Sequence, residues 1–352
     1  WRAWDWSDPG WPLCQSRYQF SQEEVRPYFP LPRVLEGMFD VVRQLFGIVV
    51  RPAAATPQVW HSDAMFFEIL DDAATVRGQF YLDAYARTNK RGGAWMADCI
   101  GRYRKPDGSL QTPVALLTCN FSPPVDDKPS LLTHEDVLTL FHEFGHGLHH
   151  MLTKVDEPAV AGINGVPWDA VELPSQFLEN WCWERAALDL ISGHFESGER
   201  LPAELLQNLR DARNFQSGLQ MVRQLEYSVF DLRLHSDETP GKQSIQDVLD
   251  EVRRDVAVVQ PPSFNRFQHS FSHIFAGGYA AGYYSYKWAE VLSADAFGRF
   301  EEQGLFDRDS GKAFLTEILE QGGVRDPLAM FVAFRGREPS VDTLLRHLGL
   351  AG

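Results

Sequence analysis

Residues 138–150 read Leu-Thr-Leu-Phe-His-Glu-Phe-Gly-His-Gly-Leu-His-His, and this stretch decides how the whole chain is interpreted. Apolar side chains recur around it at the spacing of one buried helical face, which predicts an amphipathic helix. Thr133 and Asp136 form a capping-box pattern upstream, which indicates where that helix begins. The apolar positions are Val137, Phe141, Phe144, Leu148 and either Met151 or Leu152.

This helix carries the pattern H-E-x-x-H at His142, Glu143 and His146. The two histidines lie one turn apart and project from the same side, so both imidazoles can reach one metal ion. Glu143 lies about 100° further round, which suits a base beside the metal better than a third ligand. Such a pattern also occurs by chance on solvated helices, but the apolar stripe and a matching third ligand favour a metal site. His149 and His150 are not needed there and are predicted to be hydrogen-bonded or solvent-facing.

Composition indicates an acidic globular protein. The 352 residues are 44% hydrophobic and carry a formal net charge of −15. This charge argues against nucleic acid and anionic membrane surfaces as partners, and no apolar run is long enough to span a membrane. The cysteines form no C-x-x-C pair, which argues against a disulfide framework and suggests a reducing, cytoplasmic location. They are Cys14, Cys99, Cys119 and Cys182.

The chain is predicted to form a single catalytic domain over residues 1–352, because no repeat or low-complexity linker divides it. Residues 1–60 are expected to be a mostly helical lead-in. Residues 60–125 contain short β-rich runs separated by turn signals, which predict a small, mainly antiparallel sheet. Residues 126–352 are expected to be helical and to carry the metal, with a glycine-rich interruption near 276–282.

A catalytic zinc usually takes three protein ligands, so two histidines need a partner. Glu172 is the best candidate, because a loop at 161–165 lets the chain turn back and place a second helix beside the first. Glu179 and Glu184 compete for the same role on this evidence, although both are more often supporting or surface carboxylates. Asp169, one turn before Glu172, is a candidate hydrogen-bond partner for a ligating imidazole.

Residues 273–286 combine three glycines with His273 and four tyrosines. A neutral tyrosine hydroxyl aimed at a developing oxyanion stabilises a transition state. The spacing of Tyr279, Tyr283 and Tyr286 is equally typical of a packing stripe on a helix, and spacing alone does not choose between the two interpretations.

The chain resembles the thimet-oligopeptidase family of zinc peptidases from about Tyr18 to its end. The motifs that carry this resemblance are Phe141–His146, Val171–Gln176 with Glu179–Trp181, Phe271–Tyr279 continuing to Trp288, and Phe334–Pro339. The resemblance implies a mainly α, zincin-like domain with a small antiparallel-rich sheet beside the H-E-x-x-H helix.

The same resemblance assigns roles to individual residues. It implies that His142, His146 and Glu172 bind one Zn²⁺ and that Glu143 is the general base. The sequence argument adds Asp169 and Glu179 as carboxylates expected to support the ligands. The resemblance also implies that Tyr279, Tyr286 and His273 assist catalysis. A strand near Gly93 and residues 116–120 is expected to bind the substrate main chain, with Tyr283 also at the substrate.

The expected function is zinc-dependent endopeptidase cleavage of short unstructured oligopeptides, through attack of a water bound to zinc. Family members have an additional helical amino-terminal half that forms one wall of a channel, and this chain resembles only the carboxy-terminal half. Two alternatives follow: a zinc-binding half that is inactive without its complement, and a dipeptidyl carboxypeptidase. An exposed apolar wall would also favour self-association.

Overall fold

The computed structural model describes residues 17–18, 21–54, 57–236 and 243–351. Within the expected helical lead-in of residues 1–60, positions 1–16, 19–20 and 55–56 therefore lie outside the described residues. The first elements are α2 (Gln22–Val25), a short 3₁₀ turn η2 (Arg26–Tyr28) and α3 (Leu31–Phe46). Ser21 starts α2 with a capping box, and Gly47 ends α3 in a left-handed conformation with φ of 73°. Pro27 lies within η2, and Pro30 caps the start of α3.

A five-stranded sheet follows, in the order β1-β2-β3-β7-β4. Three neighbouring pairs are antiparallel and β3 runs parallel to β7, so the sheet is mixed but antiparallel-rich, as expected. β1 lies inside the stretch expected to be helical, which corrects that part of the prediction. The strands are β1 (Val49–Pro52), β2 (Met65–Leu70), β3 (Val76–Tyr85), β4 (Trp95–Ile100) and β7 (Val114–Phe121), with a separate two-stranded ribbon of β5 (Tyr103–Arg104) and β6 (Leu110–Gln111).

Helix α4 (His134–Met151) contains the H-E-x-x-H pattern and packs on the sheet. Thr133 and Asp136 form the predicted capping box at its start. Its apolar residues Val137, Phe141 and Phe144 are buried in the main hydrophobic core, which the inner face of the sheet and α3 complete. Both predicted features of this helix, its beginning and its buried face, are confirmed.

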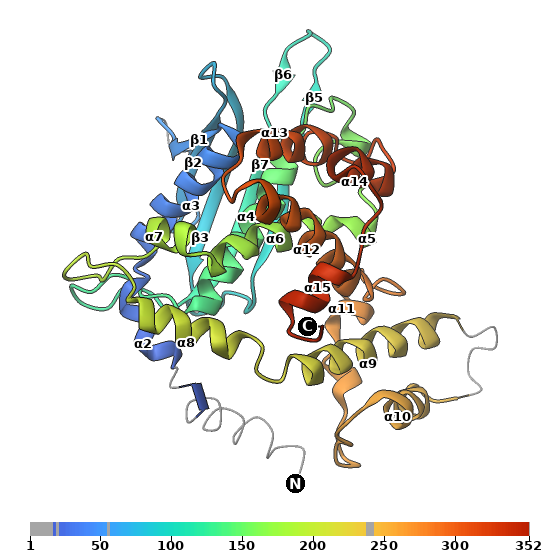
Figure 1. Cartoon of the computed structure of the whole chain (residues 1–352). Helices are drawn as coiled ribbons and strands as arrows, with labels where there is room; N and C mark the ends of the chain where they lie inside the picture. The colour runs from blue at the N-terminus through green and yellow to red at the C-terminus, as the bar shows by residue number, and fades with distance from the viewer. Residues whose placement is uncertain (1–16, 19–20, 55–56, 237–242, 352) are drawn as a thin grey trace.

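The rest of the described chain is helical and covers α4 (Figure 1). No helix in the described ranges is both long and apolar enough to cross a membrane. The elements are η3 (Pro158–Val160), α5 (Trp168–Val171), α6 (Leu173–Glu179), η4 (Asn180–Trp183), α7 (Arg185–Ile191), α8 (Ala203–Arg213), α9 (Ser217–Ser236), α10 (Ile245–Val256), η5 (Phe267–His269), α11 (Ser272–Phe275), α12 (Ser285–Gln303), α13 (Arg308–Phe314), the π-helix η6 (Leu315–Leu319), α14 (Pro327–Arg335) and α15 (Asp342–His347).

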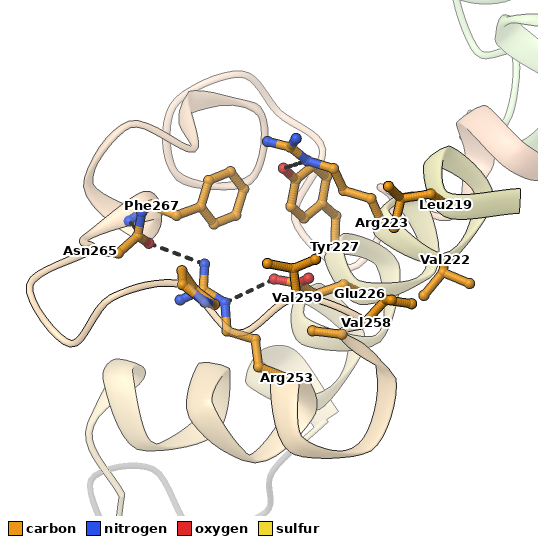
Figure 2. Close-up of a pocket in the computed structure, with 12 residues that line it drawn as sticks. Leu219, Val222, Arg223, Glu226, Tyr227, Arg253, Val258, Val259, Asn265 and Phe267 are labelled. Atoms are coloured by element: carbon orange, nitrogen blue, oxygen red, sulfur yellow. Dashed lines mark hydrogen bonds and ion pairs between the residues drawn. The ribbon is translucent and has the colours of Figure 1, made fainter. Parts of the chain in front are cut away.

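Helices α9, α10 and α11, with the chain up to Tyr283, form a second unit that we call the α9–α10 lobe. It has its own hydrophobic cluster, which includes Phe230, Leu249 and Phe271. Figure 1 shows α9 and α10 extending away from the sheet. The lobe contains a cavity of about 260 Å³, and Arg253 and Glu226 in its lining form an ion pair at 2.9 Å. Figure 2 shows the residues that line this cavity.

Candidate active site

The site depends on a close approach between α4 and α6. Gly145 faces α6 so closely that a Cβ on it would lie 2.6 Å from the carbonyl oxygen of Pro174 and 2.6 Å from Cα of Ser175. Only a residue without a side chain fits there. Because Glu172 immediately precedes α6, this contact brings its carboxylate to the histidines of α4.

Three side chains converge at this point. Nε2 of His142 lies 3.3 Å from Oε2 of Glu172, and Nε2 of His146 lies 3.1 Å from the same oxygen. One ligand atom from each residue falls within 4.8 Å of the other two. Burial alone would raise the pKa of Glu172, but the two imidazoles lower it well below its ordinary value, so this carboxylate is charged.

These separations fit a metal ion held between the three side chains. A tetrahedral zinc with bonds of about 2.0–2.1 Å places neighbouring ligand atoms about 3.3–3.4 Å apart. The distances of 3.1 and 3.3 Å from the imidazole nitrogens to Oε2 of Glu172 are close to that spacing. Two imidazoles and one carboxylate are also the donor set of several catalytic zinc sites, which leave one position open for water.

The surroundings of the histidines distinguish between the carboxylates that were candidates for the third metal ligand or for a supporting role. Oε1 of Glu179 lies 2.7 Å from Nδ1 of His142, on the side of the ring away from Glu172, so Glu179 orients the imidazole. Asp169 makes no hydrogen bond to either histidine among the described residues, which corrects the expectation for it. Glu184 pairs with Arg210 at 3.4 Å instead of facing the site.

Glu143, the two histidines and Glu172 line the same cavity, which has a volume of about 500 Å³. Its side chain is buried, and this burial raises the pKa of its carboxyl group above the ordinary value. A carboxylate with a raised pKa accepts and returns a proton near neutral pH more readily than an exposed one.

The glycine-rich loop at 276–284 and the first turn of α12 each place one tyrosine at the site, Tyr279 and Tyr286. The hydroxyl of Tyr279 donates a 2.7 Å hydrogen bond to Oε1 of Glu172, the oxygen that does not face the histidines. The ring of Tyr286 stacks on that of Tyr279 at 5.1 Å, and the ring of His273 lies 6.0 Å from both. Burial and the charge of Glu172 raise the pKa of both tyrosines, so their hydroxyl groups remain neutral donors.

Tyr283 does not reach this cavity. It is buried in the α9–α10 lobe, and its hydroxyl donates to Oε1 of Gln224 at 3.1 Å. Burial raises its pKa to about 12. The structure therefore supports the packing interpretation for this tyrosine, while contact with substrate stays a prediction.

The strand expected at the substrate lies at the rim of the cavity, although Gly93 itself does not line it. Asn120 on β7 donates to the carbonyl oxygens of Gly93 and Arg91 at 2.6 and 2.8 Å, which holds this turn in place. The turn leads into β4, whose residues Trp95 and Met96 line the cavity. Because β4 is an edge strand, one side of it is not paired within the sheet.

Sequence reasoning missed Arg91 and Trp168. Arg91 is the one lysine or arginine lining the cavity in the part of the chain that the structure describes. The ring of Trp168 lies 4.3 Å from that of Tyr279. The sequence analysis expected α5 to contribute Asp169 to the site. Trp168 directly precedes it, and no periodic pattern in the sequence indicates a role for this tryptophan.

His149 and His150 have different environments. Nε2 of His150 lies 3.0 Å from the carbonyl oxygen of Ile100, so this histidine is hydrogen-bonded as expected. His149 is buried, and neither ring nitrogen has a partner among the described residues, so the expectation is wrong for it. Burial lowers its pKa to about 3.

The helical fold and the His-His-Glu group define a metallopeptidase-like domain of the zincin type. A sequence profile for peptidase family M3 matches residues 1–350, and the chain belongs to this family. Oligopeptidase A from Escherichia coli (strain K12) is 57% identical over 339 residues, which cover 96% of this chain and 50% of that protein. The resemblance found in the motifs is thereby confirmed.

Two further proteins extend the comparison. A dipeptidyl carboxypeptidase from Salmonella typhimurium is 37% identical over 356 residues, covering 99% of this chain and 51% of that protein. The solved structure of a Pyrococcus furiosus carboxypeptidase aligns with a TM-score of 0.52 and 14% identity, over 92% of this chain and 59% of that chain, which shows a shared fold. The chain thus spans about half the length of the curated relatives described here.

Proposed function

We propose that this chain is a zinc-dependent endopeptidase that hydrolyses short, unstructured oligopeptides. The observation that carries the proposal is the convergence of His142, His146 and Glu172 beside Glu143 in one open cavity. The names of relatives that are oligopeptidases support the same function. Cytoplasmic location stays a prediction.

His142, His146 and Glu172 would hold the zinc ion, which lowers the pKa of water to about 7 and polarises a carbonyl group when bound in such sites. Glu143 takes the proton of the attacking water and returns it to the leaving amine. The hydroxyl groups of Tyr279 and Tyr286 are donors for the oxygen that becomes negative in the transition state, once Tyr279 leaves Glu172. His273 lies beside both tyrosines and is a third donor.

The free edge of β4 suits the main chain of an extended peptide. Unpaired N–H and C=O groups on an edge strand bind an extended segment as an additional strand, without regard to its side chains. Trp95 and Met96 bring this edge to the cavity. An unfolded peptide can pair in this way, whereas a strand within a folded protein already has its partners.

Zinc content and peptide cleavage test the proposal together. One zinc per chain, with cleavage of an internally quenched peptide that a chelator abolishes, is the expected result. One zinc without cleavage would support the alternative of an inactive half, and absence of zinc binding would refute the metal site. A matched peptide with an amidated carboxyl terminus separates the third candidate, because a dipeptidyl carboxypeptidase requires a free terminus and an endopeptidase does not.

Self-association stays a prediction as well. Trp168, Phe275 and Trp288 are each more than two-fifths exposed, and Trp168 borders the cavity. Exposed aromatic side chains of this size favour contact with another protein surface. Light scattering across a concentration series measures whether the chain forms dimers.

A further inference from the structure

Asp231 is a fully buried carboxylate that binds the backbone of the tyrosine loop. It lies on α9 in the α9–α10 lobe and is 0% exposed. Its Oδ1 accepts a hydrogen bond from the N–H of Ala281 at 2.9 Å, and its Oδ2 accepts one from the N–H of Tyr283 at 2.9 Å. Nδ1 of His235, one turn further along α9, lies 2.9 Å from Oδ1. Both oxygens of this carboxylate are therefore engaged.

The loop needs such an anchor because its backbone is irregular. Ala281 has a φ of +57°, a left-handed conformation that residues with a side chain rarely adopt. The hydrogen bonds between backbone groups of the loop join near neighbours in sequence, for example from Tyr279 N–H to His273 and from Gly282 N–H to Tyr279. Asp231 supplies the contacts that tie the loop to a helix distant in sequence.

The anchored residues lie between the two tyrosines of the site. Tyr279 comes two residues before Ala281 and reaches Glu172 at 2.7 Å, while Tyr286 comes three residues after Tyr283. Glu172 belongs to the body of the molecule, where Oγ of Ser175 donates to its carbonyl oxygen at 2.9 Å. The position of Tyr279 relative to Glu172 thus depends on the loop. Tyr286 is held differently, because it lies on α12 and its carbonyl oxygen accepts a 3.1 Å hydrogen bond from Nε2 of Gln176 on α6.

We propose that Asp231 is a positioning residue for peptide hydrolysis, which holds the loop so that Tyr279 faces the reacting carbonyl group. This inference rests on the proposed function. Asp231 touches neither substrate nor metal and acts through the backbone of Ala281 and Tyr283. A displacement of about 1 Å in such donors lowers rates by on the order of 100-fold, so a loosened loop should reduce kcat strongly.

Asp231→Asn is the test variant, because the amide keeps the shape but turns one acceptor into a donor that faces a backbone N–H. Glu226→Gln is a matched control, since Glu226 is a buried carboxylate five residues earlier on α9. Its carboxylate pairs with Arg253 of α10 beside the lobe cavity (Figure 2), whereas that of Asp231 binds the loop. Each variant removes the charge of a buried carboxylate on α9 that binds another segment of the chain.

We expect Asp231→Asn to lower kcat by 10- to 100-fold, with KM changed less and zinc content unchanged. Glu226→Gln should keep kcat within about twofold at a comparable loss of thermal stability. Combined with Tyr279→Phe, Asp231→Asn should reduce kcat by much less than it does alone, because the hydroxyl that it positions is absent. Equal kcat losses in the two single variants, or fully additive effects with Tyr279→Phe, would overturn the proposal.

Hydrogen exchange gives a measurement that needs neither activity nor a variant. In the unmodified chain the amides of Ala281 and Tyr283 should exchange more slowly than that of Ala280, for which the described residues supply no acceptor. Fast exchange at both anchored amides would refute the anchoring itself. Slow exchange in a chain that cleaves no peptide would instead place the failure in the proposed function.

Discussion

Replacing Gly145 by alanine should disable the metal site without altering any ligand. The glycine lies between the two histidines on α4, at the point where α6 approaches most closely. The atoms that a new Cβ would meet, Pro174 O and Ser175 Cα, belong to the backbone and cannot rotate away. The two helices must therefore separate, or the site must deform.

The size of that separation follows from the contact distances. A Cβ at 2.6 Å is about 0.8 Å short of ordinary van der Waals contact, which begins at 3.4 Å. Ser175 lies three residues after Glu172, so a shift of α6 carries this carboxylate with it. Metal–ligand distances tolerate about 0.2 Å, so a shift of this size should lower zinc affinity by at least 10- to 100-fold. Overpacking should also cost about 1–3 kcal/mol of stability.

Gly147→Ala is the matched control on the same helix. Its Cβ would meet Cδ2 of Leu117 at 3.1 Å and Cε of Met151 at 3.3 Å, both of them ends of side chains that can move. Each substitution gains the same helix propensity, about 1 kcal/mol, so the comparison isolates the contact with α6. Zinc affinity is measured by competition with a chromophoric chelator, and stability by thermal unfolding of the metal-free chain. Wild-type affinity in Gly145→Ala, or an equal loss in the control, would refute the reasoning.

Three further predictions concern the proposed base, the orientation of His142 and the response to acid. Glu143→Gln should retain zinc and lose at least 100-fold in kcat, and substantial residual turnover in a quenched-peptide assay would exclude it as the base. Glu179→Gln should lower zinc affinity by about 10- to 100-fold, because the 2.7 Å contact to His142 weakens; an unchanged chelator titration would contradict this. Burial lowers the pKa of His134 to about 4, so an unfolded chain binds a proton there below about pH 6.5 whereas the folded chain does not. Its contribution to stability is therefore complete above about pH 6.5 and falls as pH decreases, by about 2 kcal/mol at pH 5. Urea unfolding at pH 7 and pH 5 measures this loss, and a His134→Gln variant with the same pH dependence would show that another group is responsible.

The local elements were predictable because their signals are local. The cap at Thr133 and the apolar spacing over Val137–Leu148 both concern neighbours on one helix, and the structure confirms them. The strands β2, β3 and β7 have apolar runs that predict them. β1 and β4 were harder to recognise because both are edge strands, with one side unpaired and much of their surface exposed.

The sequence by itself determined the pair of histidines with the glutamate between them, since the pitch of a helix places such residues. The sequence favoured Glu172 as their partner but left Glu179 and Glu184 as competitors. Only the packing of α6 against Gly145 separates the three carboxylates. The tertiary structure also decided which tyrosines face the cavity. That choice depends on how the loop crosses from one hydrophobic core to the other, and contacts between residues distant in sequence leave no periodic signal.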